Sequence, residues 1–248
     1  MQRLQAPTMI LPQPPILALT GLSFGIERLD ELFGGLRNGE FIVFHGSRMC
    51  HILSEWLCVR GQLPQVMGGL DSSVVFVDGG NIFDPYFISE TARLFGLNPE
   101  EALKNIWISR AFTSYQMTAL ITEELPRILD REGSRLVVIS DIASLYCDPD
   151  MGMLEAKKTF NYVTQSLGNL IKKRGIVLVA TSLSSRAKRK RCLEEYLLGR
   201  ASVAARVEDG NPHLKISLEK HSSQPLASTK VFFDELRAQA LLEDFAEV

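Results

Sequence analysis

Cysteines and long apolar runs are scarce in this sequence. Its four cysteines, Cys50, Cys58, Cys147 and Cys192, are widely spaced, and no two form a CxxC pair or stand at the spacing of zinc ligands. A reducing compartment therefore fits best, either the cytoplasm with its nucleoid or, in a eukaryotic cell, the nucleus. No apolar run approaches the roughly 18 residues of a membrane span, and residues 1–19 lack the features of a signal peptide.

The net charge of the chain is small as well. The chain has 27 Lys and Arg residues against 29 Asp and Glu residues, which gives a formal net charge of -2. The molecule as a whole is therefore no polycation, and any DNA binding has to come from a local cluster of charge. With 248 residues, of which 46% are hydrophobic, the chain can bury a large core without disulfides or metal ions. We predict no metal site.

The first residues differ in composition from the rest. Prolines at positions 12, 14 and 15 predict an extended leader over residues 1–19, followed by one folded domain over residues 20–248. The leader contains apolar residues that have no core of their own, namely Ile10, Leu11, Ile16 and Leu17. We expect these four side chains to bind a partner protein.

The periodicity of the chain beyond residue 20 predicts an α/β fold. Apolar segments rich in β-branched residues predict strands at 41–45, 73–77, 105–109, 136–139 and 176–180. Segments of helical period lie between them, the clearest over residues 153–174. This alternation predicts a mostly parallel central sheet flanked by helices on both faces. Shorter strands at 202–207, 214–218 and 231–233 predict an antiparallel extension, and residues 234–247 predict a final helix.

Three segments resemble the RecA/RadA recombinase superfamily. TGLSFGIERLDELFGGLRNGE (residues 20–40) is similar to the segment that precedes the phosphate-binding loop in that superfamily. The stretch from VDGGN to YQM (residues 77–117), which includes GLNPEEALKN and RAF, resembles archaeal RadA, and RLVVISDIASLY (residues 135–146) is similar to its Walker B strand. The resemblance implies a RecA-like ATPase core whose ligands bind at the carboxyl ends of the parallel strands.

The phosphate-binding loop departs from the family pattern. A working loop reads GxxxxGK[ST], because its N–H groups and lysine bind the phosphates and its hydroxyl binds magnesium. Here FHGSRMC keeps Gly46, followed by Ser47 and Arg48, but it is about two residues short and has Met49-Cys50 where Lys-Ser/Thr belongs. A tight strand-to-helix turn without nucleotide is the favoured interpretation.

Two further departures concern hydrolysis. Gly80 stands where the family has the glutamate that orients the attacking water, and Leu183 stands where it has a glutamine that senses the γ-phosphate. Of the nucleotide-binding set only Asp141 remains, either as a residual metal ligand or as a carboxylate that caps a neighbouring segment. The three departures together predict a pseudo-ATPase with no catalytic residue and no ATP or Mg²⁺ cofactor.

One basic cluster stands out in the sequence. The resemblance places a DNA-binding loop after the strand near residue 180, and residues 184–191 read SSRAKRKR. We expect sequence-neutral binding of DNA by the five cations of this loop, although a solvated loop is the plain alternative. These cations are Arg186, Lys188, Arg189, Lys190 and Arg191.

The resemblance and the departures together predict a function. They indicate a non-catalytic RecA/RadA-like paralog, an accessory factor in DNA recombination and repair that binds DNA, a recombinase or a sister paralog. A weak ATPase of the same family is one alternative. A signalling or scaffold protein of the KaiC-like branch is another, because that branch shares the SxGIxxLDELxGG pattern seen at residues 23–35.

Overall fold

A computed structural model describes residues 21–232 and 235. The predicted leader, with Ile10, Leu11, Ile16 and Leu17, and the helix expected at residues 234–247 lie outside the described residues, apart from position 235. Among the described residues, no helix is long and apolar enough to cross a membrane.

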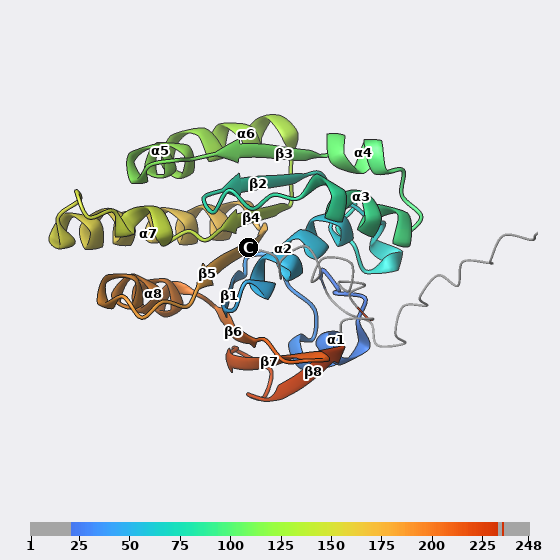
Figure 1. The fold of residues 1–248 in the computed structure, drawn as a ribbon. Coiled ribbons are helices and arrows are strands. Elements are labelled where there is room, and N and C mark those ends of the chain that lie inside the picture. Colours follow the sequence, from blue (N-terminus) through green and yellow to red (C-terminus); the bar gives the residue numbers. More distant parts are fainter. Residues whose placement is uncertain (1–20, 233–234, 236–248) are drawn as a thin grey trace, which may run out of the picture.

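The described part of the chain is organised around one eight-stranded sheet. Its strand order is β3-β2-β4-β5-β1-β6-β7-β8, which Figure 1 shows from top to bottom. Strands β3 to β6 in this order are parallel, and β7 and β8 are antiparallel additions. The strands are β1 (Phe41–Gly46), β2 (Val74–Asp78), β3 (Ile106–Arg110), β4 (Leu136–Ser140), β5 (Val177–Leu183), β6 (Val203–Glu208), β7 (His213–Lys220) and β8 (Ser228–Phe232).

The sheet agrees with the prediction from periodicity. Each predicted strand overlaps an observed one, and the expected antiparallel extension toward the C-terminus is confirmed. The last strand was placed too late: β8 begins at Ser228 rather than at residue 231. Its only buried residue is Val231, so the apolar pattern that marks a strand is confined to its end.

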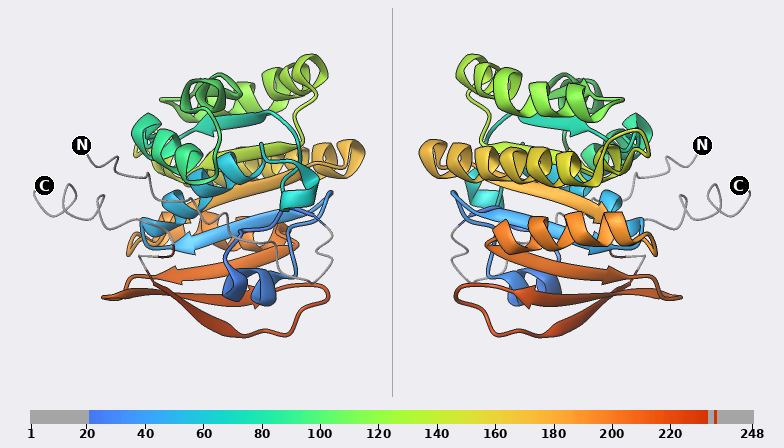
Figure 2. Two further views of the ribbon diagram at one scale, coloured as in Figure 1. Left: turned by 90° about the vertical axis from the view of Figure 1, so that its right-hand side faces the viewer. Right: turned by 90° about the vertical axis from the view of Figure 1, so that its left-hand side faces the viewer.

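Helices cover both faces of the sheet. Figure 2 shows the two sides in turn, with α7 and α8 in front of one face and α1 and α2 in front of the other. The first layer consists of α1 (Glu27–Phe33), α2 (Met49–Arg60), α3 (Pro85–Leu94) and α4 (Pro99–Lys104). The second consists of α5 (Ser114–Ala119), α6 (Leu125–Glu132), α7 (Met153–Arg174), which confirms the predicted long helix, and α8 (Lys188–Arg200).

Each face of the sheet has its own apolar core. Along β1, Ile42 and Phe44 face the first helical layer, whereas Phe41 and Val43 face the second. All four side chains are buried, as expected for a central strand covered on both sides. Three short helical segments complete the structure: η1 (Gln65–Met67), the π-helix η2 (Leu120–Glu124) and η3 (Ser144–Cys147).

A buried aspartate organises the segment before β1. The Asp30 carboxylate accepts hydrogen bonds from the N–H of Phe24 at 2.7 Å, from the N–H of Gly25 at 3.0 Å and from the Ser23 hydroxyl at 2.7 Å. Burial is the largest effect on the pKa of Asp30 and raises it, while the three hydrogen bonds oppose that shift. This carboxylate therefore holds the turn that starts α1.

We expect Asp30→Ala to destabilise the fold by about 2–3 kcal/mol, because it leaves the buried N–H of Phe24 and the Ser23 hydroxyl without their acceptor and removes one of the two acceptors of the Gly25 N–H. Urea unfolding measures this change. The matched control is Glu31→Ala, since Glu31 is the exposed neighbour on the same helix and its loss should change stability by less than about 0.5 kcal/mol. Equal effects of the two substitutions would contradict the role given to Asp30.

Candidate functional site

The carboxyl ends of the parallel strands form the candidate site. The residues singled out in the sequence follow β1, β2, β4 and β5, and strands of one parallel sheet end at the same edge. The structure brings Asp141 and Lys190 together there, and it places Arg48 and Gly80 along one cavity.

The turn between β1 and α2 is very short. Strand β1 ends at Gly46 and α2 begins at Met49, so only Ser47 and Arg48 lie between them. Gly46 has a φ of 123°, and a Cβ at that position would lie 2.2 Å from the carbonyl oxygen of Val207. A glycine is therefore required where the chain leaves the sheet beside β6.

The N–H groups of this turn are used inside the protein. Ser47 N–H donates to the Val207 carbonyl at 2.9 Å, and Met49 N–H donates to the Ser47 hydroxyl at 3.3 Å. Cys50 and His51 donate to the carbonyls of Ser47 and Arg48 at 3.2 and 2.9 Å. These are the groups that would face a phosphate in a longer loop.

Asp141 follows β4 and is almost completely buried. Its Oδ1 accepts a hydrogen bond from the N–H of Leu183 at 3.2 Å, and its own N–H donates to the Thr181 hydroxyl at 2.8 Å. Its φ of 37° lies in the left-handed region, which aspartate tolerates better than most residues. The bonds to β5 hold the residue in that conformation.

Lys190 neutralises the Asp141 carboxylate. Its Nζ lies 3.0 Å from Oδ1 and 3.1 Å from Oδ2 of Asp141, and only 13% of the lysine side chain is exposed. A buried carboxylate needs such a partner, because an unpaired charge in the interior is costly. Asp141 is thus bonded to the end of β5 and paired with one of the cations that the sequence assigned to DNA.

The loop after β2 is held by a second buried aspartate. Asp78 accepts hydrogen bonds from the Ser140 hydroxyl at 2.8 Å and from the N–H of Ile82 at 3.0 Å. Ser140 in turn accepts from the N–H of Gly80 at 3.1 Å. Gly80 has no side chain, so it contributes only its backbone N–H and carbonyl groups to the site.

The expectation of a basic loop at residues 184–191 needs correction. Helix α8 begins at Lys188, so four of the five cations lie in its first turn. Arg189 donates to the carbonyls of Tyr146 (3.1 Å) and Met151, and with Lys190 paired to Asp141 both side chains point into the protein. The leucines that follow pack against the sheet and so wind this segment as a helix. Arg186, Lys188 and Arg191 are the exposed cations.

A charge cluster at His45 escaped sequence reasoning. His45 is buried at the end of β1, with Nε2 2.8 Å from Glu219 on β7 and Nδ1 3.6 Å from Glu194 on α8. Arg206 on β6 donates to the other oxygen of Glu219 at 2.6 Å. Because these residues are far apart in sequence, no motif spacing could have indicated the cluster, which fixes α8 against β1.

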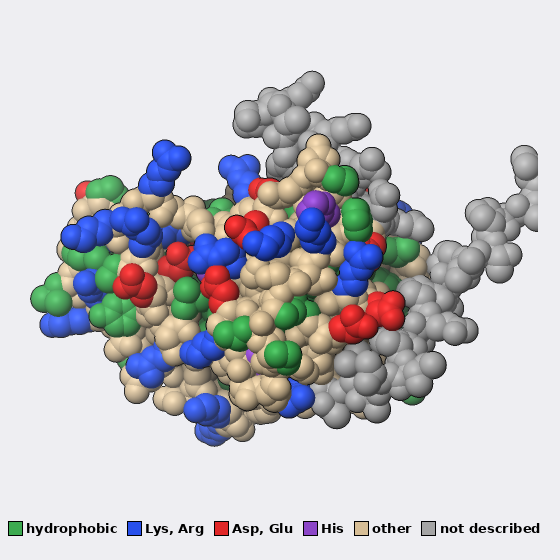
Figure 3. Space-filling view, turned by 90° about the horizontal axis from the view of Figure 1, so that it is seen from below, with side chains coloured by type: hydrophobic (Ala, Val, Ile, Leu, Met, Phe, Trp, Pro, Cys, Tyr) green, Lys and Arg blue, Asp and Glu red, His purple; other side chains and the backbone are tan. Residues whose placement is uncertain are grey.

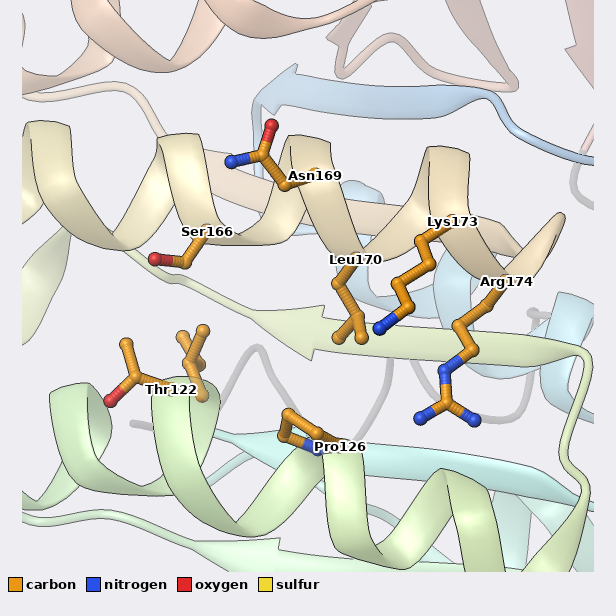
Figure 4. Close-up of a pocket in the computed structure, with 8 residues that line it drawn as sticks. Thr122, Pro126, Ser166, Asn169, Leu170, Lys173 and Arg174 are labelled. Carbon is orange, nitrogen blue, oxygen red and sulfur yellow. The ribbon is translucent and has the colours of Figure 1, made fainter.

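Two cavities are relevant to the search for a binding site. The larger, about 770 Å³, lies beside the β1–α2 turn and reaches the β6–β7 turn. The smaller, about 330 Å³, lies between η2, α6 and the last turns of α7, where Figure 4 shows Leu170, Lys173 and Arg174 opposite Pro126. Since α7 leads into the start of β5, this second cavity is toward the opposite end of the sheet.

The strand order and the site define a RecA-like α/β core. A sequence model of the Rad51 family matches residues 17–187, which is more than half of the chain, so the chain belongs to the Rad51 family. It is also similar to the "DNA repair and recombination protein RadA" of Aeropyrum pernix, with 34% identity over 125 residues. That match covers 50% of this chain and 36% of the relative, so the chain spans about a third of the curated relative.

The ion pair between Lys190 and Asp141 gives a test of the site's structure. We expect Lys190→Met to destabilise the fold by about 2–4 kcal/mol, because the Asp141 carboxylate stays buried without its cation. Adding Asp141→Asn should recover most of the loss, since the charge that needs compensation is then gone. Thermal and urea unfolding measure both effects.

Lys188→Met is the matched control, because Lys188 is exposed and lies two residues earlier in the same helical turn. It should be nearly neutral. If the double variant were no more stable than Lys190→Met alone, the ion pair would not be the source of the effect.

Proposed function

We propose that this Rad51-family protein is a non-catalytic paralog, an accessory factor in DNA recombination and repair that binds DNA, a recombinase partner, or both. The observation that carries the proposal is the occupation of the Asp141 carboxylate by Lys190 at 3.0 Å. Lys190 therefore occupies the carboxylate that a RecA-like ATPase would need free for its metal ion and nucleotide.

The residues present do not fit ATP with Mg²⁺. The two-residue turn after β1 directs its N–H groups to protein acceptors, and Met49 and Cys50 are buried where a lysine and a hydroxyl would be needed. Gly80 and Leu183 have no side-chain group that could orient a water or bond a γ-phosphate. We therefore derive no catalytic step through a nucleotide.

We expect no ATP hydrolysis above background, with or without DNA. Phosphoryl transfer depends on positioning and charge neutralisation, and both are missing in this arrangement. Phosphate release at saturating ATP and Mg²⁺ is the measurement, with Asp141→Asn as the control variant. Turnover that Asp141→Asn abolished would support the weak ATPase alternative instead.

DNA binding is supported by the exposed cations at the start of α8. Arg186, Lys188 and Arg191 form no ion pair with any described residue, and they lie at the carboxyl end of the sheet. The first turn of α8 contains no acidic residue, and clustered cations oppose the dipole at a helix N-terminus. A bound phosphate backbone would relieve this repulsion.

The face of the molecule on the β8 side is a poorer DNA surface. Figure 3 shows that face with Lys and Arg side chains interspersed with Asp and Glu. On β6 and β7, Arg206 pairs with Glu219 and Lys215 pairs with Glu208. Charges that are already paired release few counterions on binding DNA and so contribute little affinity.

Replacing Arg186, Lys188 and Arg191 together by glutamine should abolish most binding of single-stranded DNA. If the three contact one phosphate each, the log-log salt slope of the native protein should be about -2. Fluorescence anisotropy with a labelled oligonucleotide at several salt concentrations measures both. The matched control replaces Arg127, Lys172 and Lys173, which are exposed on α6 and α7, and removes the same charge. Equal loss in both triple variants would mean that net charge, not this surface, governs binding.

A recombinase partner has two candidate contact surfaces. The predicted leader residues lie outside the described part and remain a prediction. Within the described part, β3 is the edge strand of the sheet and exposes 40% of Trp107 and 43% of Ile108. An open edge with exposed apolar side chains is suited to pairing with a strand of another chain.

A further inference from the structure

Three large apolar side chains are exposed at the starts of α5 and α7. Phe112 and Tyr115 are 67% and 66% exposed, and Leu154 is 67% exposed. The N–H of Phe112 donates to the Gln116 side chain at 2.8 Å, and the Tyr115 hydroxyl donates to the Glu155 carboxylate at 3.0 Å. The second bond links the two helix starts and leaves the ring in solvent. Exposed apolar side chains that lie together mark an interaction surface.

Carboxylates lie around these apolar side chains. Asp148 and Asp150 in the segment before α7 and Glu155 in its first turn are exposed, and they form no ion pair with any described residue. The hydrogen bond to Glu155 raises the pKa of Tyr115, and the charges of Glu155 and Asp148 raise it further, so both carboxylates are close to the ring. The exposed Lys158, one turn further along α7, bounds this group. We call the group the acidic surface: Phe112, Tyr115, Asp148, Asp150, Leu154 and Glu155.

The exposed cations at the start of α8 lie on the same end of the molecule. Arg189 donates to the carbonyls of Tyr146 and Met151, which ties the first turn of α8 to the segment that contains Asp148 and Asp150. Figure 1 shows α5, α7 and α8 in that order along one side of the sheet, and each of them starts on the carboxyl side of a strand. Positive side chains therefore lie next to the acidic surface. We call them the basic surface: Arg186, Lys188 and Arg191.

An acidic and a basic surface side by side make this end of the molecule self-complementary. In a two-fold pair, whatever one protomer contacts on its partner, the partner contacts on it, so every contact occurs twice. When the two-fold axis passes between the two surfaces, the acidic surface of each protomer faces the basic surface of the other. We propose that two copies of this chain pair reversibly in this way, through the carboxyl end of the sheet.

The side chains of the two surfaces suit each other in more than charge. A guanidinium plane stacks on an aromatic face and binds a carboxylate through two parallel hydrogen bonds, so the arginines of one protomer match Tyr115 and Glu155 of the other. The aliphatic stems of these arginines cover apolar surface such as Leu154. Nucleic acid suits the acidic surface poorly, because three carboxylates repel its phosphates. The pairing goes beyond the proposed function and does not depend on it.

Sedimentation equilibrium of the full chain, without DNA, measures the pairing. Few residues take part on each side, so we expect a dissociation constant of about 10–100 µM at about 50 mM salt rather than a permanent dimer. Salt screens exposed charges, so the pairing should weaken at least about tenfold when the salt concentration is raised to about 500 mM. A chain that stayed monomeric at a concentration of about 300 µM in the low-salt buffer would overturn the proposal.

Charge reversal distinguishes this pair from any other self-association. The acid-reversed variant carries Asp148→Lys, Asp150→Lys and Glu155→Lys. The base-reversed variant carries Arg186→Glu, Lys188→Glu and Arg191→Glu. Each variant alone should pair at least about tenfold more weakly, because like charges then face each other. An equimolar mixture should regain the native affinity, since both contacts are complementary again. If the mixture paired as weakly as the separate variants, while melting temperatures showed both to be folded, the proposal would be wrong.

The matched control for the acid-reversed variant carries Glu31→Lys, Glu90→Lys and Glu101→Lys. It changes the net charge by the same amount, but at exposed positions of α1, α3 and α4, which cover the other face of the sheet. It should pair as the native chain does. An equal loss of pairing in this control would show that net charge and not the acidic surface governs the association, and would refute the proposed pair.

The aromatic side chains give a test in which no charge changes. Phe112→Ala combined with Tyr115→Ala should weaken the pairing about tenfold, because aromatic anchors contribute much of the affinity of small interfaces. Tyr86→Ala is the matched control, since Tyr86 is an aromatic residue on α3 that is 80% exposed and lies outside both surfaces. Native affinity in the double variant would exclude the acidic surface from the contact and so contradict the proposal.

Discussion

The buried Asp141 carboxylate is the constraint on which the carboxyl end of the sheet depends. It follows β4, receives the N–H of Leu183 from β5, and is neutralised by Lys190 from α8. A charge buried to this degree has to be compensated, so the first turn of α8 is drawn back over the strand ends. Three elements are thereby fixed by one carboxylate.

The position of α8 then decides which basic residues reach solvent. Lys190 is committed to Asp141 and Arg189 to carbonyls near η3, while Arg186, Lys188 and Arg191 stay outside. Farther along the helix, Glu194 approaches His45 on β1. The same contacts that pair Asp141 with Lys190 therefore leave a small cationic surface exposed at the start of α8.

The cavity beside α2 is a separate consequence of the short β1–α2 turn. With the N–H groups of the turn bound inside the protein, no loop projects over the helix, and the face that carries His51 and Glu55 lines an open space. Both side chains are buried, and Nε2 of His51 has no hydrogen-bond partner among the described residues.

The sequence by itself determined the strand positions, the long helix of residues 153–174 and the missing lysine, because these depend on local periodicity and on residue identity. It also indicated the short turn after Gly46. Only the tertiary structure decided the roles of the basic residues: Asp141 and Lys190 are 49 positions apart, and His45 and Glu219 are 174 apart. Side chains that meet at the carboxyl end of a parallel sheet follow different strands, and the crossover connections between those strands differ greatly in length. Local pattern cannot indicate such pairs, since the burial that makes each charge need its partner exists only once the layers have packed.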